Sequence, residues 1–224
     1  MNTAIVHYWQ NSDQFGHAVA YLLLLMSLAS WTFMLAKAWS FWRVRKAAGV
    51  IKSFWLAPTM TDALVLLQQR DSEETFLSLA QAAVGAMDSQ QRVATLSGQS
   101  DISDVLMRTL RDALQTEISR LERGLTLLAS VGATAPFVGL LGTVWGIYHA
   151  LTTISIAGAV QIDQLAGPVG EALIMTAFGL IVAIPAVLAF NAFNRINRIT
   201  LAELDGFAHD LHAYLSHQQE NNGS

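Results

Sequence analysis

Three long stretches of the sequence are apolar and contain no charged residue: 18–36, 124–148 and 172–194. About 20 such residues form a helix that can cross the roughly 30 Å hydrocarbon layer of a bilayer. We therefore predict three transmembrane helices, at 18–42, 124–154 and 168–194. The first apolar run is too long for a secretory signal peptide and has no basic segment before it, so we expect it to stay in the protein.

Outside these stretches, apolar residues recur every three or four positions, which is typical of amphipathic helices. One stripe consists of Leu106, Leu110, Leu114, Ile118, Leu121, Leu125 and Leu128. No proline interrupts it before Pro136, so we predict one continuous helix from about 104 to 154. A second stripe extends the third span and consists of Ile196, Ile199, Leu204, Phe207, Leu211 and Leu215. A shorter pattern, interrupted by the polar stretch 70–75, contains Leu64, Leu67, Phe76, Leu79 and Ala83.

The positions of the basic residues predict the orientation of the spans. Basic side chains follow the first span, precede the second and close the third: Arg43, Arg45, Lys46, Lys52, Arg120, Arg123, Arg195 and Arg198. Short loops rich in Lys and Arg stay in the cytoplasm. We therefore expect segment 1–17 and the link 155–167 to be periplasmic, and the helical loop 43–123 and the helix and tail 195–224 to be cytoplasmic. The predicted fold class is all-α, an integral membrane protein with three transmembrane helices, two of them extended into the cytoplasm as long amphipathic helices.

Composition removes several classes of function. Of the 224 residues, 53% are hydrophobic and only 13% are charged, and the net charge is −4. This balance excludes a basic nucleic-acid binder. The sequence has no cysteine and no zinc-protease or phosphate-loop motif, so we expect no cofactor, no metal and no enzymatic activity. His209 and His212, beside Asp205 and Asp210, are more typical of a solvated helix face than of a metal site.

The second and third spans are rich in small residues. Small side chains spaced about four apart let helix backbones approach closely in lipid, where no hydrophobic drive brings helices together. We assign helix packing to Gly132, Gly139, Gly142, Gly146 and Gly179. Pro136 and Pro185 are predicted to kink their helices, because each removes a helical N–H and frees a carbonyl.

Glu171 is the candidate with the clearest chemistry. Apart from Asp163 in the outer link, it is the only charged residue between 124 and 194. An ionisable side chain in a span usually faces a bundle interior and marks an ion or proton path, and a desolvated carboxylate can load and release a proton. The alternative is an electrostatic role, because Gly167 and Pro168 are typical of a helix start and Glu171 would then stabilise the helix dipole.

Two threonines accompany Glu171 as polar groups of the spans. The hydroxyl of Thr143 either bonds a backbone carbonyl or points into a polar pathway. Thr176 lies five residues after Glu171, about 140° around an ideal helix. The two side chains therefore cannot face one axis unless the helix is unwound or the pathway is shared between subunits.

Two segments make the chain resemble a known family. They are Gly-Ala-Thr-Ala-Pro-Phe-Val-Gly-Leu-Leu-Gly-Thr-Val-Trp-Gly-Ile at 132–147 and Gly-Glu-Ala-Leu-Ile-Met-Thr-Ala-Phe-Gly-Leu-Ile-Val-Ala-Ile-Pro-Ala at 170–186. Both resemble the ExbB/TolQ branch of the MotA/TolQ/ExbB proton-channel family, and the order of spans, loop and tail is similar over nearly the whole chain. The residues at 135–138 resemble the ExbB members more than the TolQ members.

The resemblance implies more than the patterns do. It implies a subunit of a bacterial inner-membrane stator, assembled as a homo-oligomeric ring, a pentamer, around a single-span partner of the ExbD kind. Proton flow would then energise TonB and transport at the outer membrane. By matched position, the resemblance implies that Thr143, Glu171 and Thr176 line the proton path. Two alternatives stay open: a TolQ-like subunit of the Tol-Pal envelope system, and a passive ring scaffold for the single-span partner.

Overall fold

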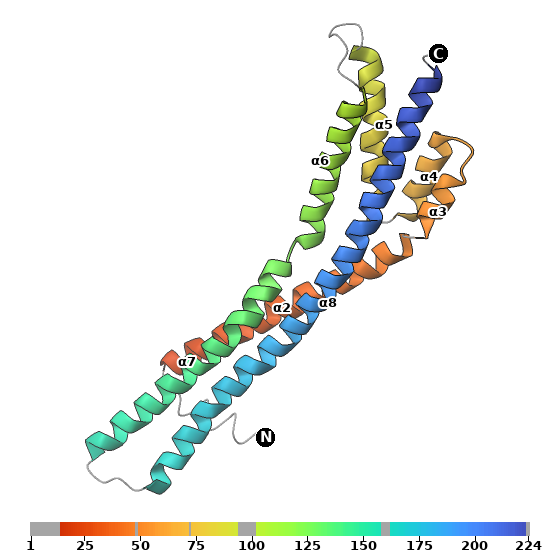
Figure 1. Ribbon diagram of the computed structural model, residues 1–224. Coiled ribbons are helices and arrows are strands. Elements are labelled where there is room, and N and C mark those ends of the chain that lie inside the picture. Colours follow the sequence, from red (N-terminus) through yellow and green to blue (C-terminus); the bar gives the residue numbers. More distant parts are fainter. Residues whose placement is uncertain (1–13, 48, 72, 94–101, 158–161, 223–224) are drawn as a thin grey trace. The chain divides into compact units, whose positions relative to one another are not determined.

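The computed structural model describes residues 14–47, 49–71, 73–93, 102–157 and 162–222, and this part of the chain is helical, with no strand (Figure 1). Some side chains within these ranges, among them that of Glu171, lie outside the description. So do parts of the predicted periplasmic segments 1–17 and 155–167. The helices are α2 (Gln14–Ala47), α3 (Val50–Trp55), α4 (Met60–Arg70), α5 (Thr75–Val93), α6 (Ile102–Glu122), α7 (Leu125–Ala157) and α8 (Ile162–Asn222).

Three helical stretches are long and apolar enough to cross a membrane, as the sequence predicts. They belong to α2, to the α6–α7 region and to α8. Large apolar side chains on these helices are exposed in the isolated chain, including Leu25, Leu35, Phe137, Ile181 and Leu188. Such a surface requires lipid or another protein chain to cover it. The all-α membrane fold is therefore confirmed.

The prediction of one continuous helix from 104 to 154 is wrong at two residues. Helix α6 ends at Glu122 and α7 begins at Leu125. Between them Gly124 has φ +83°, a left-handed conformation that glycine adopts without steric cost. A side chain on Gly124 would also come within 2.7 Å of the Phe33 ring. Sequence periodicity missed the turn because the apolar stripe continues across it.

Helix α8 is longer than predicted. It begins at Ile162 and runs for 61 residues, which at 1.5 Å per residue is roughly 90 Å. Gly167 and Pro168 therefore lie inside the helix and do not start it. Pro168 is the seventh residue of the helix and has no N–H, so the carbonyl of Gln164, four residues earlier, lacks its usual helical donor.

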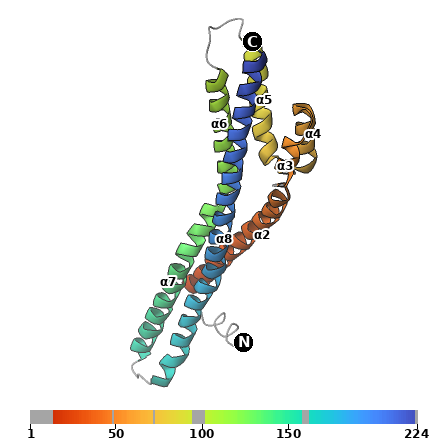
Figure 2. The ribbon, with the colours of Figure 1, turned by 45° about the vertical axis from the view of Figure 1, so that its right-hand side comes forward.

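The chain divides into two compact units. The first unit contains 1–35 and 124–193, and in it α7 and the first part of α8 lie side by side and antiparallel (Figures 1 and 2). Its core joins α2, α7 and α8 and is made of small and medium apolar side chains: Val19, Leu23, Val131, Ala135, Met175, Val182, Ala183 and Ala186. The small residues of the spans are thus placed where two helices meet.

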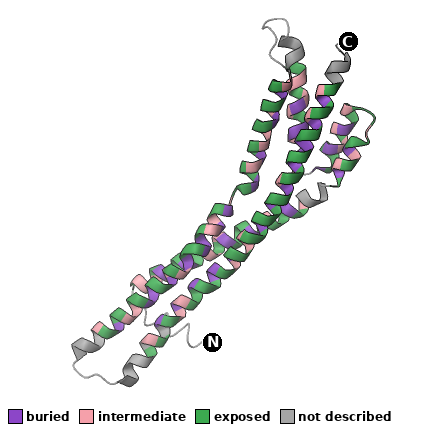
Figure 3. Ribbon diagram, in the orientation of Figure 1, coloured by how far each residue is buried: buried purple, intermediate pink, exposed green. Residues whose placement is uncertain are grey.

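The second unit contains 36–123 and 194–224. Helix α5 packs on α6 and α4, and α3 packs on α4. Its core contains Leu67, Phe76, Leu79, Leu204 and Leu211, each completely shielded from solvent (Figure 3). Phe207 of α8 joins the helices, because its ring contacts those of Phe54 and Phe76 at 5.1 and 5.7 Å.

The buried face of α8 in this unit differs from the predicted stripe at its first two positions. Ile196 and Ile199 are exposed, whereas the neighbouring Asn197 and Thr200 are buried. The buried positions repeat at intervals of three and four: Phe193, Asn197, Thr200, Leu204, Phe207, Leu211 and Leu215. Two polar residues therefore occupy helix-packing positions, and apolarity alone selected the wrong face.

Candidate functional site

The contact between α7 and α8 is closest at two glycines. A Cβ atom on Gly139 would lie 2.6 Å from the carbonyl oxygen of Met175 and 3.1 Å from the Cα of Gly179. A Cβ atom on Gly179 would lie 2.6 Å from the carbonyl oxygen of Ala135. Because these neighbours are backbone atoms, no side-chain rotation could make room. Glycine at both positions allows the two helix backbones to touch.

The other packing glycines extend this contact along α7. Gly132 faces Val187, and a Cβ atom on Gly146 would lie 3.2 Å from the Cβ of Ala172. A Cβ atom on Gly142 would lie 3.1 Å from Val19 of α2. We call the face of α7 formed by Gly132, Gly139, Gly142, Thr143 and Gly146 the small-residue face. It contacts α8 at positions from Gly132 to Gly146.

Thr143 lies on the small-residue face between Gly139 and Gly146. Its side chain is only 4% exposed. Its hydroxyl donates a hydrogen bond of 2.7 Å to the Leu140 carbonyl of its own helix. Of the two interpretations drawn from the sequence, the structure has the bond to a backbone carbonyl.

Glu171 lies on α8 beside Ala172, and therefore at the level of Gly146. It follows the first residue of the helix by nine positions, since α8 begins at Ile162. The favourable effect of a helix N-terminus on a carboxylate fades within the first turn. The observed start of α8 therefore weakens the electrostatic interpretation, and the proton role of Glu171 stays a prediction.

Thr176 is half-buried, and its Cα would lie 3.2 Å from a Cβ atom on Gly139. The contacts of Gly139 and Gly146 bring 172–176 of α8 opposite the α7 turn that carries Thr143. The structure thus brings Thr143, Thr176 and the backbone of Glu171 to one level of the helix pair.

Pro136 and Pro185 both lie inside helices that continue beyond them. Proline has no N–H, so the carbonyls four residues earlier, those of Gly132 and Ile181, lack their usual helical donor. Pro136 is adjacent to Ala135, whose carbonyl contacts Gly179. The proline of α7 therefore sits where the two helices are closest.

Sequence analysis missed a polar cluster at the C-terminal end of α6. The Lys37 ammonium donates to the Leu121 carbonyl at 2.6 Å, and the Asn197 amide donates to the same oxygen at 2.8 Å. Two features of the sequence could have indicated this cluster. Lys37 ends an apolar run, and Asn197 falls on the spacing of three and four residues that marks the buried stripe of α8. Neither type of residue would be assigned to a packed interior by hydropathy.

A second missed cluster lies between α5 and α6 in the second unit. Glu117 of α6 is buried and accepts a 3.0 Å hydrogen bond from Ser78. Its other oxygen lies 3.8 Å from the Arg120 guanidinium. Glu117 lies outside the predicted spans, and burial raises the pKa of its carboxyl above the ordinary value, with the nearby Asp71 charge adding to the effect while Ser78 and Arg120 oppose it.

Arg120 extends this cluster towards α2. It donates to the Glu73 carbonyl at 2.8 Å and lies 3.8 Å from the Glu73 carboxylate, which also pairs with Arg43 at 3.3 Å. These pairs are partly exposed, so each contributes little to stability by itself. Their arrangement links the end of α2 to the segment before α5.

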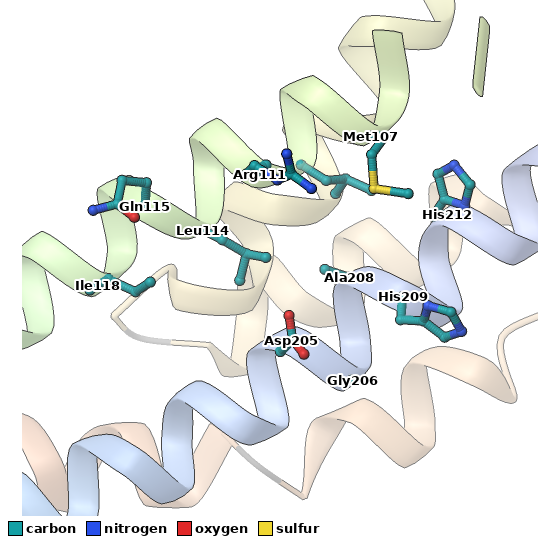
Figure 4. A pocket seen from close by; sticks show the side chains of 11 residues that line it. Met107, Arg111, Leu114, Gln115, Ile118, Asp205, Gly206, Ala208, His209 and His212 are labelled. Atoms are coloured by element: carbon teal, nitrogen blue, oxygen red, sulfur yellow. The ribbon is translucent and has the colours of Figure 1, made fainter. Parts of the chain in front are cut away.

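A groove of about 490 Å³ runs between α6 and the second part of α8 (Figure 4). Its floor is apolar, with Leu110, Leu114 and Ala208, while Arg111 and His209 line its sides. His212, another lining residue, lies 3.1 Å from the Ser103 hydroxyl. Among the residues described, no three His, Asp or Glu side chains are close enough to hold a metal ion.

Comparison with known proteins agrees with this arrangement. The profile of the MotA/TolQ/ExbB proton channel family matches residues 71–205. The biopolymer transport protein ExbB of Xanthomonas campestris pv. campestris is 46% identical over 199 residues, 87% of this chain and 79% of the relative. The ExbB of Neisseria meningitidis is 38% identical over 99% of this chain and its own whole length. The Tol-Pal system protein TolQ of Haemophilus influenzae is 45% identical over 38% of this chain and 37% of the relative. The chain therefore belongs to the MotA/TolQ/ExbB proton channel family.

Proposed function

We propose that the chain is the ring-forming subunit of an inner-membrane complex that uses the proton-motive force to energise TonB-dependent transport across the outer membrane. One observation carries the choice within the family. The relatives named ExbB align with this chain over 81% to 99% of its length, whereas the TolQ relatives of Haemophilus influenzae and Pseudomonas aeruginosa align over 38% and 51% of it. As a member of a proton channel family, the chain is a transport component of the inner membrane and not an enzyme.

The geometry of the spans supports a proton path that runs between chains. Within one chain, Gly139 and Gly179 bring the backbones of α7 and α8 into contact, so no aqueous path fits between them there. Large apolar side chains are exposed on the other faces of both helices, for example Phe137 and Ile181. In the proposed ring, a pentamer, neighbouring copies and lipid cover these faces.

In this proposal the polar groups come from two kinds of chain. Glu171 carries or tunes the proton, while Thr143 and Thr176 line the path at the same level. A single-span partner of the ExbD kind stands in the centre of the ring and supplies a second carboxylate to the path, beside Glu171. One proton crossing about 100 mV releases about 2.3 kcal/mol, so a working stroke on TonB requires several protons or strong coupling across the ring.

The proposed orientation follows from the charged flanks. Arg43, Arg120, Arg123, Arg195 and Arg198 stand at the same end of the three spans in the chain order, and short basic flanks stay in the cytoplasm. The N-terminus is then periplasmic and the C-terminus cytoplasmic. Helices α3 to α6 and the end of α8 accordingly form the cytoplasmic part.

The test of the proton role is Glu171→Gln in the assembled complex. TonB-dependent uptake should be lost, while membrane insertion and the native mass of the complex stay unchanged. Glu203→Gln is the matched control, since Glu203 is an exposed acid of the same helix. Normal uptake in Glu171→Gln would overturn the proton role.

The two alternatives give different outcomes. A passive scaffold predicts equal proton flux in vesicles that hold the partner and either the wild type or Glu171→Ala. A TolQ-like role is favoured only by the matched segment of high identity, and it predicts that deletion of the gene impairs envelope constriction and leaves TonB-dependent uptake intact.

A further inference from the structure

The three crossings between the two units of the chain fall within a few residues of one polar cluster. The units divide after Leu35 in α2, after Arg123 at the end of α6 and after Phe193 in α8. Lys37, Leu121 and Asn197 each lie within four residues of one of these crossings, all within the second unit. Along the chain, the cluster therefore lies close to each point where one unit ends and the other begins.

A single carbonyl oxygen joins the three helices. The Leu121 oxygen accepts one hydrogen bond from the Lys37 ammonium at 2.6 Å and a second from the Asn197 amide at 2.8 Å. Lys37 also reaches the Arg123 carbonyl at 3.4 Å. The last carbonyls of a helix have no partner within it, and a lysine near that end satisfies them while balancing the negative end of the dipole. We call Lys37, Asn197 and the Leu121 carbonyl the polar collar.

The polar residues of the collar occupy places where apolar side chains would be expected. Asn197 is 2% exposed and interrupts a stripe that otherwise buries Phe193 and Leu204. Its Oδ1 atom is buried without a hydrogen-bond partner among the described residues. A leucine would pack there without leaving a polar atom unsatisfied. The asparagine therefore costs stability, and what it provides is the hydrogen bond that holds the Leu121 carbonyl in place.

The collar lies directly beside the turn at which α7 begins. Gly124, in its left-handed conformation, follows Arg123, and its position is confined by the Phe33 ring of α2. Phe33 and Lys37 are four residues apart and thus share one face of α2. One face of α2 therefore touches both sides of the turn, the end of α6 through Lys37 and the start of α7 through Phe33.

We propose that Lys37 and Asn197 are positioning residues for the proton path. By holding the Leu121 carbonyl they fix the conformation of the turn at Gly124, from which α7, the helix that carries Thr143, begins. This inference rests on the proposed function, because it assigns the collar to the path that the assembled complex provides.

The test compares proton flux per assembled complex in vesicles that also contain the single-span partner. Lys37→Met removes the donor and keeps the stem, Lys37→Arg keeps a donor, and Asn197→Leu keeps the approximate volume. We expect flux to fall by about tenfold or more in Lys37→Met and Asn197→Leu, because a misplacement of about 1 Å can cost a factor of 100. Proton flux in Lys37→Arg should stay within about twofold of the wild type, because arginine also supplies a cationic donor to the same carbonyl.

The matched controls are Lys52→Met and Asn194→Leu, which remove exposed residues of the same types. Both should conduct like the wild type. Hydrogen exchange at the Leu128 amide, which donates to the Gly124 carbonyl at 3.3 Å, supplies the second readout, and it should accelerate in Lys37→Met and Asn197→Leu alone. If Lys37→Met does not assemble, Asn197→Leu decides the outcome.

Three results would overturn the inference. They are full flux per assembled complex in Asn197→Leu, an equal loss in Lys37→Arg and Lys37→Met, and failure of both Lys37→Met and Asn197→Leu to assemble, which would make the collar a folding element only. Absence of partner-dependent flux in the wild type would instead overturn the proposed function. The hydrogen-exchange comparison would then still decide whether the collar positions α7.

Discussion

The contact between Gly139 and Gly179 gives a prediction whose size can be worked out from the structure. In Gly139→Ala the new methyl group would stand 2.6 Å from the Met175 carbonyl oxygen, and ordinary contact begins at 3.4 Å. The helices must therefore separate locally by about 0.8 Å. Overpacking of this kind costs about 1–3 kcal/mol, because Ala135 and Met175, both fully buried, lose close contacts when the helices part.

The same substitution has a second, favourable effect that must be removed by a control. Alanine is about 1 kcal/mol better than glycine inside a helix. Gly170→Ala and Gly206→Ala carry this gain without the clash, since a Cβ atom at either position meets nothing within 4 Å. The difference in unfolding free energy between Gly139→Ala and these controls then reports the steric cost, about 1–3 kcal/mol.

The double variant Gly139→Ala/Gly179→Ala tests whether the two positions form one contact. Each new methyl group would lie 3.1 Å from the other glycine's Cα. Once the first has parted the helices, the second finds room, so the double variant should cost less than the sum by about 0.5–3 kcal/mol. The assay is reversible unfolding in mixed micelles, followed by circular dichroism. Equal stability of Gly139→Ala and the controls, or strict additivity, would refute the close contact.

Three further outcomes are expected. Gly124→Ala should lower the unfolding free energy by about 1–3 kcal/mol, because alanine is strained at positive φ, and a normal thermal midpoint would contradict the turn. Asp71→Ala should lower the unfolding free energy by about 1–3 kcal/mol, because Asp71 accepts hydrogen bonds of 2.6 and 3.0 Å from two buried amides at the start of α5. Hydrogen exchange at those amides should become faster, and Asp88→Ala, at an exposed position, is the control. Burial raises the pKa of Glu117 above 4.5, so its contribution to stability is full below that pH and is lost as the pH rises through the folded value. The unfolding free energy of Glu117→Gln relative to the wild type should therefore rise with pH. Denaturant titration measures it, with Glu122→Gln as the control, and a difference that does not change with pH would contradict the prediction.

Hydrophobic runs predicted the fold class because lipid-spanning helices depend on length and apolarity. The intervals of three and four also identified Leu67, Phe76 and Leu79, which are completely buried. The same reasoning failed at Gly124 because an apolar stripe can continue across a turn. Only the conformation of that glycine reveals where one helix stops and the next begins.

Site residues were predictable only where their chemistry was out of place in the sequence. Glu171 was proposed because an acid is conspicuous in an uncharged run, and its role stays a prediction. Lys37, Asn197 and Glu117 were missed because their roles depend on which face of a helix is buried. On α8 that face contains Asn197 and Thr200 rather than Ile196 and Ile199, and hydropathy favours the isoleucines for the interior.

The packing of α7 on α8 and the exposed faces of both helices favour an assembly of several chains. The small-residue face of α7 is used up in contact with α8, and the Thr143 hydroxyl is already bonded to Leu140. The backbones of these two helices are therefore too close at Gly139 and Gly179 to leave an aqueous path between them within one chain. The remaining faces of α7 and α8 expose large apolar residues such as Phe137 and Ile181, which do not carry protons. We therefore expect that polar groups of other chains complete the proton path in the proposed ring, and that the close glycine contact holds the helix pair that carries Glu171.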